Sequence, residues 1–166
     1  CAGMMGHDYL QLFEGSPEFD KVQRFAARVY DLSQYLDEIL QVNYEDKGEK
    51  IKVAWHSNCH ALRVAKSVEA SKNLIRKFAN VELLELEHEE ECCGFGGTFA
   101  VKENDISNAM ALAKIEDIKK TGASYLISGD GGCLLNISGT MKRNGVDIKC
   151  LHLYDFLIKR LEGAPL

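Results

Sequence analysis

Several features that would indicate a class of partner are missing from this sequence. It contains no block of Lys or Arg, and its formal net charge of −5 argues against a surface that binds nucleic acid. Its longest apolar runs fall far short of the roughly 20 residues that a membrane-spanning helix needs, and no signal peptide is visible. We therefore expect a cytoplasmic protein with no nucleic-acid partner and no membrane span.

The composition that is present is typical of a folded domain. The chain has 166 residues, of which 46% are hydrophobic and 27% are charged. A chain of about this length buries roughly 68–70% of its unfolded surface, so a sizeable core is expected. We expect one domain, with or without an appendage. The sequence starts at Cys1 rather than Met, which indicates processing or a piece of a longer chain.

Six cysteines lie at positions 1, 59, 92, 93, 133 and 150. A disulfide scaffold would be expected in a much shorter secreted chain with weak hydrophobic patterning. Here the hydrophobic pattern predicts helices and strands without any need for cross-links. We therefore expect reduced thiols that are either buried or bound to metal.

The hydrophobic pattern changes near residue 50. Residues 1–48 show only helical periodicity and end in a polar run, whereas alternation at residues 51–55 predicts a strand. Further strand-like segments at 81–87, 125–127 and 147–151 alternate with helical ones. This order predicts an α/β fold, with a Rossmann-like parallel sheet of about four strands flanked by helices and preceded by a helical segment. We place the boundary between a helical lead-in, residues 1–48, and an α/β domain, residues 49–166.

Cysteines follow three of the four predicted strands. Cys59 comes after the first strand, Cys92 and Cys93 after the second, and Cys133 after the third. Ligands of open parallel sheets bind beyond the carboxyl ends of the strands, where these segments meet. The topology therefore predicts that the four thiols converge.

The stretch 91–97 has an unusual composition, because two adjacent cysteines cannot both be core residues on one face of an element. Gly94, Gly96 and Gly97 allow backbone dihedrals that are closed to other residues and a close approach to a bulky group. Their N–H groups can also donate to cluster sulfides. The cysteine separations are not the close pairs of zinc fingers. Four converging thiolates therefore match an iron–sulfur cluster or a structural zinc ion.

Other candidate residues have plainer interpretations. Cys150 lies on the last predicted strand and is expected to be a small buried hydrophobic residue. His56 and His60 flank Cys59 and are either ligands or donors of the site, or structural histidines. The spacing of the glycines in 94–97 lacks the full dinucleotide fingerprint, so nucleotide binding is not expected. The acidic run 85–91 is expected to be a solvated face.

Three local sequences resemble those of a known family. They are HSNCHALR at 56–63, ECCGFGGTFAVK at 91–102 and GCLLNISG at 132–139. Over residues 50–161 the chain resembles the cysteine-rich CCG domain family, which includes heterodisulfide reductase B-like subunits, and within it the lactate utilisation protein A family. The resemblance implies an iron–sulfur cluster, most simply [4Fe–4S], with zinc as the alternative. The implied ligands are Cys59, Cys92, Cys93 and Cys133, and the implied backbone approach is at Gly94, Gly96 and Gly97.

The resemblance also implies a function. It predicts an iron–sulfur electron-transfer subunit of an oxidoreductase complex that oxidises L-lactate to pyruvate, with other iron–sulfur subunits as partners and self-association left open. No residue stands out as an acceptor of hydride or proton from lactate, so the chain is expected to be a subunit and not a complete catalyst. The alternative is a structural zinc or thiol/disulfide redox module that assembles a complex.

Two details of the resemblance concern individual residues. The family carries two repeats, and Cys1–Met5 resembles the last cysteine motif of the first repeat. This chain is therefore expected to be the C-terminal part of a longer protein, with Cys1 serving the other repeat. Asn136 stands where the five-cysteine version of the motif has its last cysteine. A cubane on four cysteines is therefore favoured over a double cluster on five.

Overall fold

The chain folds around a parallel β-sheet. A computed structural model describes residues 1–166 and contains four strands: β1 (Ile51–His56), β2 (Val81–Leu84), β3 (Tyr125–Ser128) and β4 (Lys149–His152). Their order in the sheet is β2-β1-β3-β4, and all three pairings are parallel. The predicted α/β, Rossmann-like fold with four parallel strands is confirmed.

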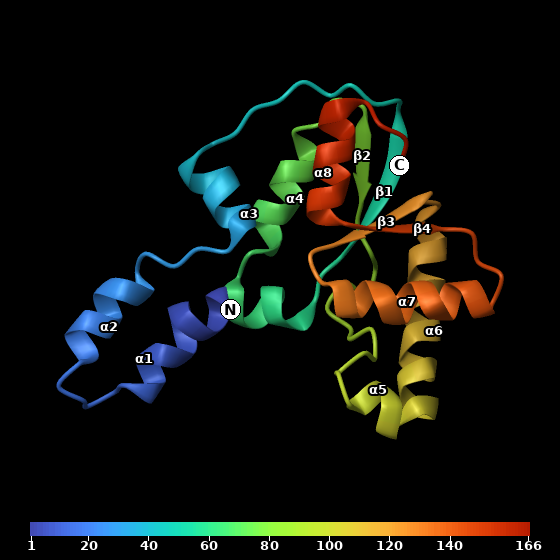
Figure 1. The fold of residues 1–166 in the computed structure, drawn as a ribbon. Helices are drawn as coiled ribbons and strands as arrows, with labels where there is room; N and C mark the ends of the chain where they lie inside the picture. The colour runs from blue at the N-terminus through green and yellow to red at the C-terminus, as the bar shows by residue number, and fades with distance from the viewer.

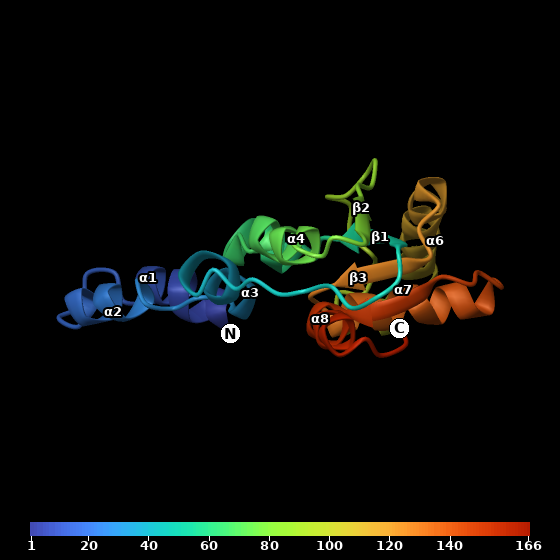
Figure 2. The ribbon, with the colours of Figure 1, turned by 90° about the horizontal axis from the view of Figure 1, so that it is seen from above.

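Helices cover both faces of this sheet (Figures 1 and 2). Helices α4 (Val68–Arg76) and α8 (Leu153–Glu162) pack on one face, with the core residues of β1 and β3 that point toward them. Helices α6 (Asn104–Thr121) and α7 (Gly131–Arg143) pack on the other. None of the helices combines the length and the apolar composition needed to cross a membrane.

The central strands divide their side chains between two cores. On β1, Val53 and Trp55 enter the core beneath α4 and α8, whereas Ala54 enters the core beneath α6 and α7. On β3, Ile127 and Leu126 divide in the same way. This division follows from the two-residue period of a strand, and it explains why both strands are apolar on both faces.

The lead-in is helical, as predicted. It consists of the short elements η1 (Met4–Asp8), α1 (Tyr9–Leu12), α2 (Phe19–Ala26), α3 (Leu32–Gln34) and η2 (Tyr35–Ile39). In Figure 1 the blue α1 and α2 extend away from the sheet, while α3 lies beside α4. Asp31 begins α3 with a capping box, since its side chain accepts from the Ser33 N–H and the Gln34 side chain accepts from the Asp31 N–H.

The polar run between the lead-in and β1 is fastened to the last helix. The carboxylate of Asp46 lies 2.5 Å from Nη2 of Arg160 on α8, and both side chains are almost fully buried. Nη1 of Arg160 also donates to the Glu49 carbonyl oxygen over 2.8 Å. The segment that crosses the sheet domain is therefore held by a buried ion pair, although the domain boundary at residue 48 stays a prediction.

Two element boundaries matter for the site. Strand β2 ends at Leu84 rather than near residue 87, because the next residues turn to place Glu85 and Glu89 on the ammonium of Lys72. Helix α7 begins at Gly131, where Asp130 is the N-cap and its carboxylate accepts from the Cys133 N–H over 2.8 Å. Cys133 therefore lies in the first turn of a helix and not on a loop.

Candidate metal centre

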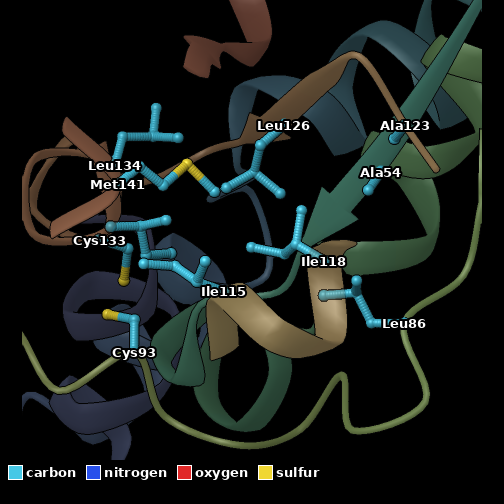
Figure 3. Packing of buried hydrophobic residues seen from close by; sticks show 11 residues of the cluster. Ala54, Leu86, Cys93, Ile115, Ile118, Ala123, Leu126, Cys133, Leu134 and Met141 are labelled. Atoms are coloured by element: carbon cyan, nitrogen blue, oxygen red, sulfur yellow. The ribbon is translucent and has the colours of Figure 1, made fainter. Parts of the chain in front are cut away.

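The segments that leave the carboxyl ends of β1, β2 and β3 carry the predicted site residues. Cys59 follows β1, Cys92 and Cys93 follow β2, and Cys133 follows β3 in the first turn of α7. All six cysteines are free thiols. In Figure 3 the sulfur atoms of Cys93 and Cys133 point toward one another beside the core of α6 and α7.

Three of the residues at this edge form a compact buried group. One ring nitrogen of His56 and the Sγ atoms of Cys93 and Cys133 all lie within 4.8 Å of one another. The exposed fractions of these residues are only 1%, 1% and 8%. His56 is the last residue of β1, so the sheet itself positions its ring. Two sulfurs and a nitrogen at this separation are a donor set for a soft or borderline metal.

The imidazole of His56 has no hydrogen-bond partner. Both Nδ1 and Nε2 are buried and neither makes a hydrogen bond, although the main-chain carbonyl of His56 accepts from Ser128 Oγ over 2.9 Å. Leaving a buried polar group unpaired is costly, so such an orphan calls for an explanation. A metal or a metal-bound sulfur beside Cys93 would supply the missing partner. The residues present therefore fit a metal centre.

Cys93 and Cys133 behave as an asymmetric pair. The Cys133 thiol, acting as hydrogen-bond donor, lowers the pKa of Cys93 against the opposing effect of burial, and the neighbouring His56 ring lowers it further. The same contact, together with burial, raises the pKa of Cys133. The contact therefore favours the thiolate on Cys93 and the thiol on Cys133, and the thiolate is the form that binds metals.

The other two predicted ligands lie at the surface. Cys59 and Cys92 are both exposed. Burial raises the pKa of Cys92, the N–H of Gly94 opposes this by donating to its Sγ over 3.4 Å, and the charges of Cys93 and Cys59 raise it again. Cys59 is thus close enough to act electrostatically on Cys92. That all four thiolates bind one centre stays a prediction.

The glycines after Cys93 have backbone angles that L-residues rarely adopt. Gly94 has a φ of +83°, and a Cβ there would lie 2.5 Å from the Ser107 carbonyl oxygen on α6. Gly96 has a φ of +48° and lies against Phe99, at the start of the short helix α5 (Phe99–Lys102). Gly97 has a φ of +61° and open space around it. Gly94 and Gly96 thus approach the protein closely, while the predicted approach to a cofactor stays a prediction.

The two buried cysteine segments are tied together by Asn136, Ser107 and Phe95, of which the sequence singled out only Asn136, as the position of a missing cysteine. The amide of Asn136 on α7 donates to the Cys93 carbonyl over 2.9 Å, and Ser107 Oγ donates to the Gly94 carbonyl over 2.7 Å. The ring of Phe95 lies so close to Gly132 that a Cβ there would be 2.4 Å from it. In the sequence, only the glycine at 132 indicated the contact with Phe95. The hydrogen bonds of Asn136 and Ser107 had no such signal, because polar residues on a helix show no pattern that reveals their partners.

The acidic run before Cys92 is only partly the solvated face that was expected. Glu89 accepts from the buried ammonium of Lys72 over 2.7 Å and from the Ser57 hydroxyl. The carboxylate of Asp117 on α6 accepts from the N–H groups of Glu87 and His88, over 3.2 and 2.9 Å. These contacts anchor the segment on both sides, so the cysteine pair follows a fixed turn and not a free loop.

The remaining candidates lie away from the buried group. His60 is exposed and its ring lies against Gly3 of the lead-in, where a Cβ would be 2.5 Å from Nε2. Cys1 is exposed. Cys150 on β4 packs against the α6–α7 core with its sulfur 3.9 Å from Met141 Sδ, and burial raises its pKa to about 11. Its surroundings are those of a small hydrophobic residue.

A parallel α/β sheet with buried and exposed thiols at its carboxyl edge defines a cysteine-rich metal-binding domain. Residues 53–138 match the family described as CCG, cysteine-rich domain. Lactate utilization protein A from Oceanobacillus iheyensis is 36% identical over 165 residues, which are 99% of this chain and 67% of that protein. The protein of the same name from Shouchella clausii is 40% identical over 160 residues, 95% of this chain and 66% of that protein. The chain therefore belongs to the lactate utilization protein A family and spans about two thirds of the length of these relatives.

Proposed function

We propose that this chain is an iron–sulfur electron-transfer subunit of an oxidoreductase complex that oxidises L-lactate to pyruvate. The substrate is inferred from the name of the relatives, lactate utilization protein A. The chemistry is taken from the thiols at the carboxyl edge of the sheet. A metal centre in this family member is consistent with both.

The observation that carries the proposal is the buried group of His56, Cys93 and Cys133. Its ligand atoms lie within 4.8 Å of one another, and the thiols are free in spite of their proximity. Buried cysteines that serve only as packing do not need an unpartnered histidine beside them. Cys92 is adjacent in sequence, and Cys59 lies close enough to shift its pKa. We therefore propose Cys59, Cys92, Cys93 and Cys133 as the ligands.

The roles of this chain's residues follow from their positions. Cys93 and Cys133 would hold the buried side of the centre, and Cys59 and Cys92 its exposed side. The N–H groups of the 94–97 turn are donors that can offset the negative charge of thiolates and sulfides. When bound, a [4Fe–4S] cluster carries one electron at a time. An exposed pair of ligands would bring that carrier to the surface, where a partner subunit can exchange electrons with it.

The proposed setting is a cytoplasmic complex with other iron–sulfur or oxidoreductase subunits. The chain acts there as a relay, because its proposed site offers thiolates and backbone donors but no group placed to accept a hydride from lactate. Electron transfer therefore begins on a partner. Self-association is a second form of assembly that size measurement of the purified complex would reveal.

Metal and acid-labile sulfide analysis of anaerobically purified protein tests the proposal. We expect iron with matching sulfide, and a broad visible absorption that bleaches when dithionite is added. The reduced protein should give a cluster signal in electron paramagnetic resonance. Stoichiometric zinc without sulfide would replace the proposal by the alternative, a structural module that assembles a complex.

A further inference from the structure

We propose that His56 donates a ring N–H to the Cys93 thiolate of the metal-bound site, and that this contact stabilises the bound metal and raises the reduction potential of the centre. His56 would be a positioning residue beneath the cysteine ligands and not a ligand itself. The inference rests on the proposed function, because it concerns the same site.

The first support is the burial of a ring that has nothing to bind. His56 is 1% exposed, and neither of its ring nitrogens has a partner. The hydrogen bonds of this residue use its main chain, which pairs with β3 and accepts from Ser128 Oγ. A buried ring without a hydrogen-bond partner is costly. Its position therefore calls for a group that the ring can bond.

The second support is the direction in which the ring lies. One ring nitrogen is within 4.8 Å of both buried sulfurs. Neither ring nitrogen is engaged by another protein group. The ring is therefore placed to donate to the Cys93 sulfur, which the N–H of Phe95 also approaches.

The third support is the arrangement of the cysteines and His56 on different sides of the site. Cys59 and Cys92 approach from the exposed side, whereas His56 lies on the buried side at the end of β1. The four cysteines already supply the proposed ligands, so the ring is left to act on a sulfur. Hydrogen bonds to ligand sulfurs offset the negative charge that reduction adds, and they raise the potential of a cluster.

Two substitutions separate the effect of the N–H donor from the effect of the bulk of the ring. His56→Gln keeps an N–H donor in a side chain of similar reach, and His56→Leu keeps the bulk without any donor. The matched control is His60→Leu, since His60 flanks Cys59 from the other side but is exposed and faces Gly3. Each variant is purified anaerobically with its native metal. Metal release to a chelator and thermal unfolding of the metal-free form are measured, together with the midpoint potential where iron is bound.

We expect His56→Leu to release metal about tenfold faster than the unsubstituted protein, because a hydrogen bond to a charged group is lost. Its midpoint potential should be lower, with His56→Gln in between and His60→Leu unchanged. The metal-free His56→Leu protein should be at least as heat-stable as the unsubstituted one, because no hydrogen bond is broken there. Weak ¹⁴N coupling in pulsed electron paramagnetic resonance should vanish in His56→Leu.

Three results would overturn the inference. One is unchanged metal release in His56→Leu, and another is a metal-free His56→Leu protein that unfolds at a markedly lower temperature, which would mean a structural histidine. The third is a strong ¹⁴N coupling typical of direct ligation. Failure of the proposed function looks different: the unsubstituted protein would hold zinc without iron or sulfide. In that case the release of zinc from the His56 variants still decides the role of the ring.

Discussion

The side-chain amide of Asn136 donates a hydrogen bond to the main-chain carbonyl of Cys93, with 2.9 Å between Nδ2 and the oxygen. Asn136 stands on α7 where the five-cysteine motif has its last cysteine, so this position supplies no thiolate. It holds the backbone of a proposed ligand instead. The same amide lies 3.4 Å from Ser107 Oγ on α6, which links the two helices that flank the buried thiols.

Replacing Asn136 tests this structural role. Asn136→Ala should lower the free energy of unfolding by about 1–2 kcal/mol, because it removes a hydrogen bond and leaves the Cys93 carbonyl without that partner. Chemical denaturation of the metal-free protein measures the change. Ser138→Ala, two positions along α7, is the control, because the Ser138 hydroxyl bonds only within its own helix. Equal destabilisation in the two variants would argue against the proposed role.

The proposed ligand set predicts unequal effects of two cysteine substitutions. Cys93→Ala should abolish the metal centre, because it removes a buried sulfur from the group with His56 and Cys133. Cys150→Ala should keep the centre, because Cys150 packs beside Met141 on the last strand. The iron and sulfide content of each variant, per molecule of protein, measures whether the centre is present. Loss of the centre in both variants to the same extent would mean that the assignment is wrong.

Two of the three glycines that follow the cysteine pair should respond differently to a methyl group. Gly97→Ala should cost roughly 1–2 kcal/mol, because its left-handed backbone disfavours an L-residue while the space around it is open. Gly94→Ala should cost clearly more, because its Cβ would also meet the Ser107 carbonyl oxygen 2.5 Å away. We expect Gly94→Ala to lose metal as well. Unfolding curves and metal analysis of the two variants measure both effects. Equal losses of stability in the two variants would contradict the prediction.

The buried ion pair between Asp46 and Arg160 predicts a dependence of stability on pH. Burial raises the pKa of Asp46, but Arg160 and the N–H groups of Gly48 and Asn80 outweigh it and hold the pKa below its ordinary value of 3.8. Stability from this group is therefore complete above about pH 4 and is lost as the pH falls through the lowered pKa of the folded state.

Asp46→Asn should remove that part of the acid dependence and lower the free energy of unfolding at neutral pH by about 3–5 kcal/mol, since Arg160 keeps a buried charge without its partner. Denaturation at pH 7 and at pH 3 measures both effects. Glu116→Gln is the control, because its ion pair with Lys119 is exposed and should contribute less than about 1 kcal/mol. A pH profile of Asp46→Asn parallel to that of the unsubstituted protein would contradict the expectation.

Local patterns were enough to predict the sheet and the edge at which the thiols lie. Alternation at residues 51–55 predicted β1, and Val53, Ala54 and Trp55 indeed divide between two cores. Parallel order then placed Cys59, the Cys92–Cys93 pair and Cys133 at the carboxyl ends, because the direction of each strand follows from its helical crossover. Periodicity and topology are both encoded in the order of residues along the chain, so the sheet and its thiol-bearing edge could be predicted without the tertiary structure.

The inner arrangement of the site depended on contacts between distant residues. Whether His56 is a ligand, a donor or a structural histidine was open from its position beside Cys59. Only the folded chain places its ring, without partners, within 4.8 Å of Cys93 and Cys133. Cys59 is a proposed ligand of the same site, yet the fold leaves it exposed. Burial and side-chain direction are set by packing between α6, α7 and the strands, and no local pattern of residues encodes that packing.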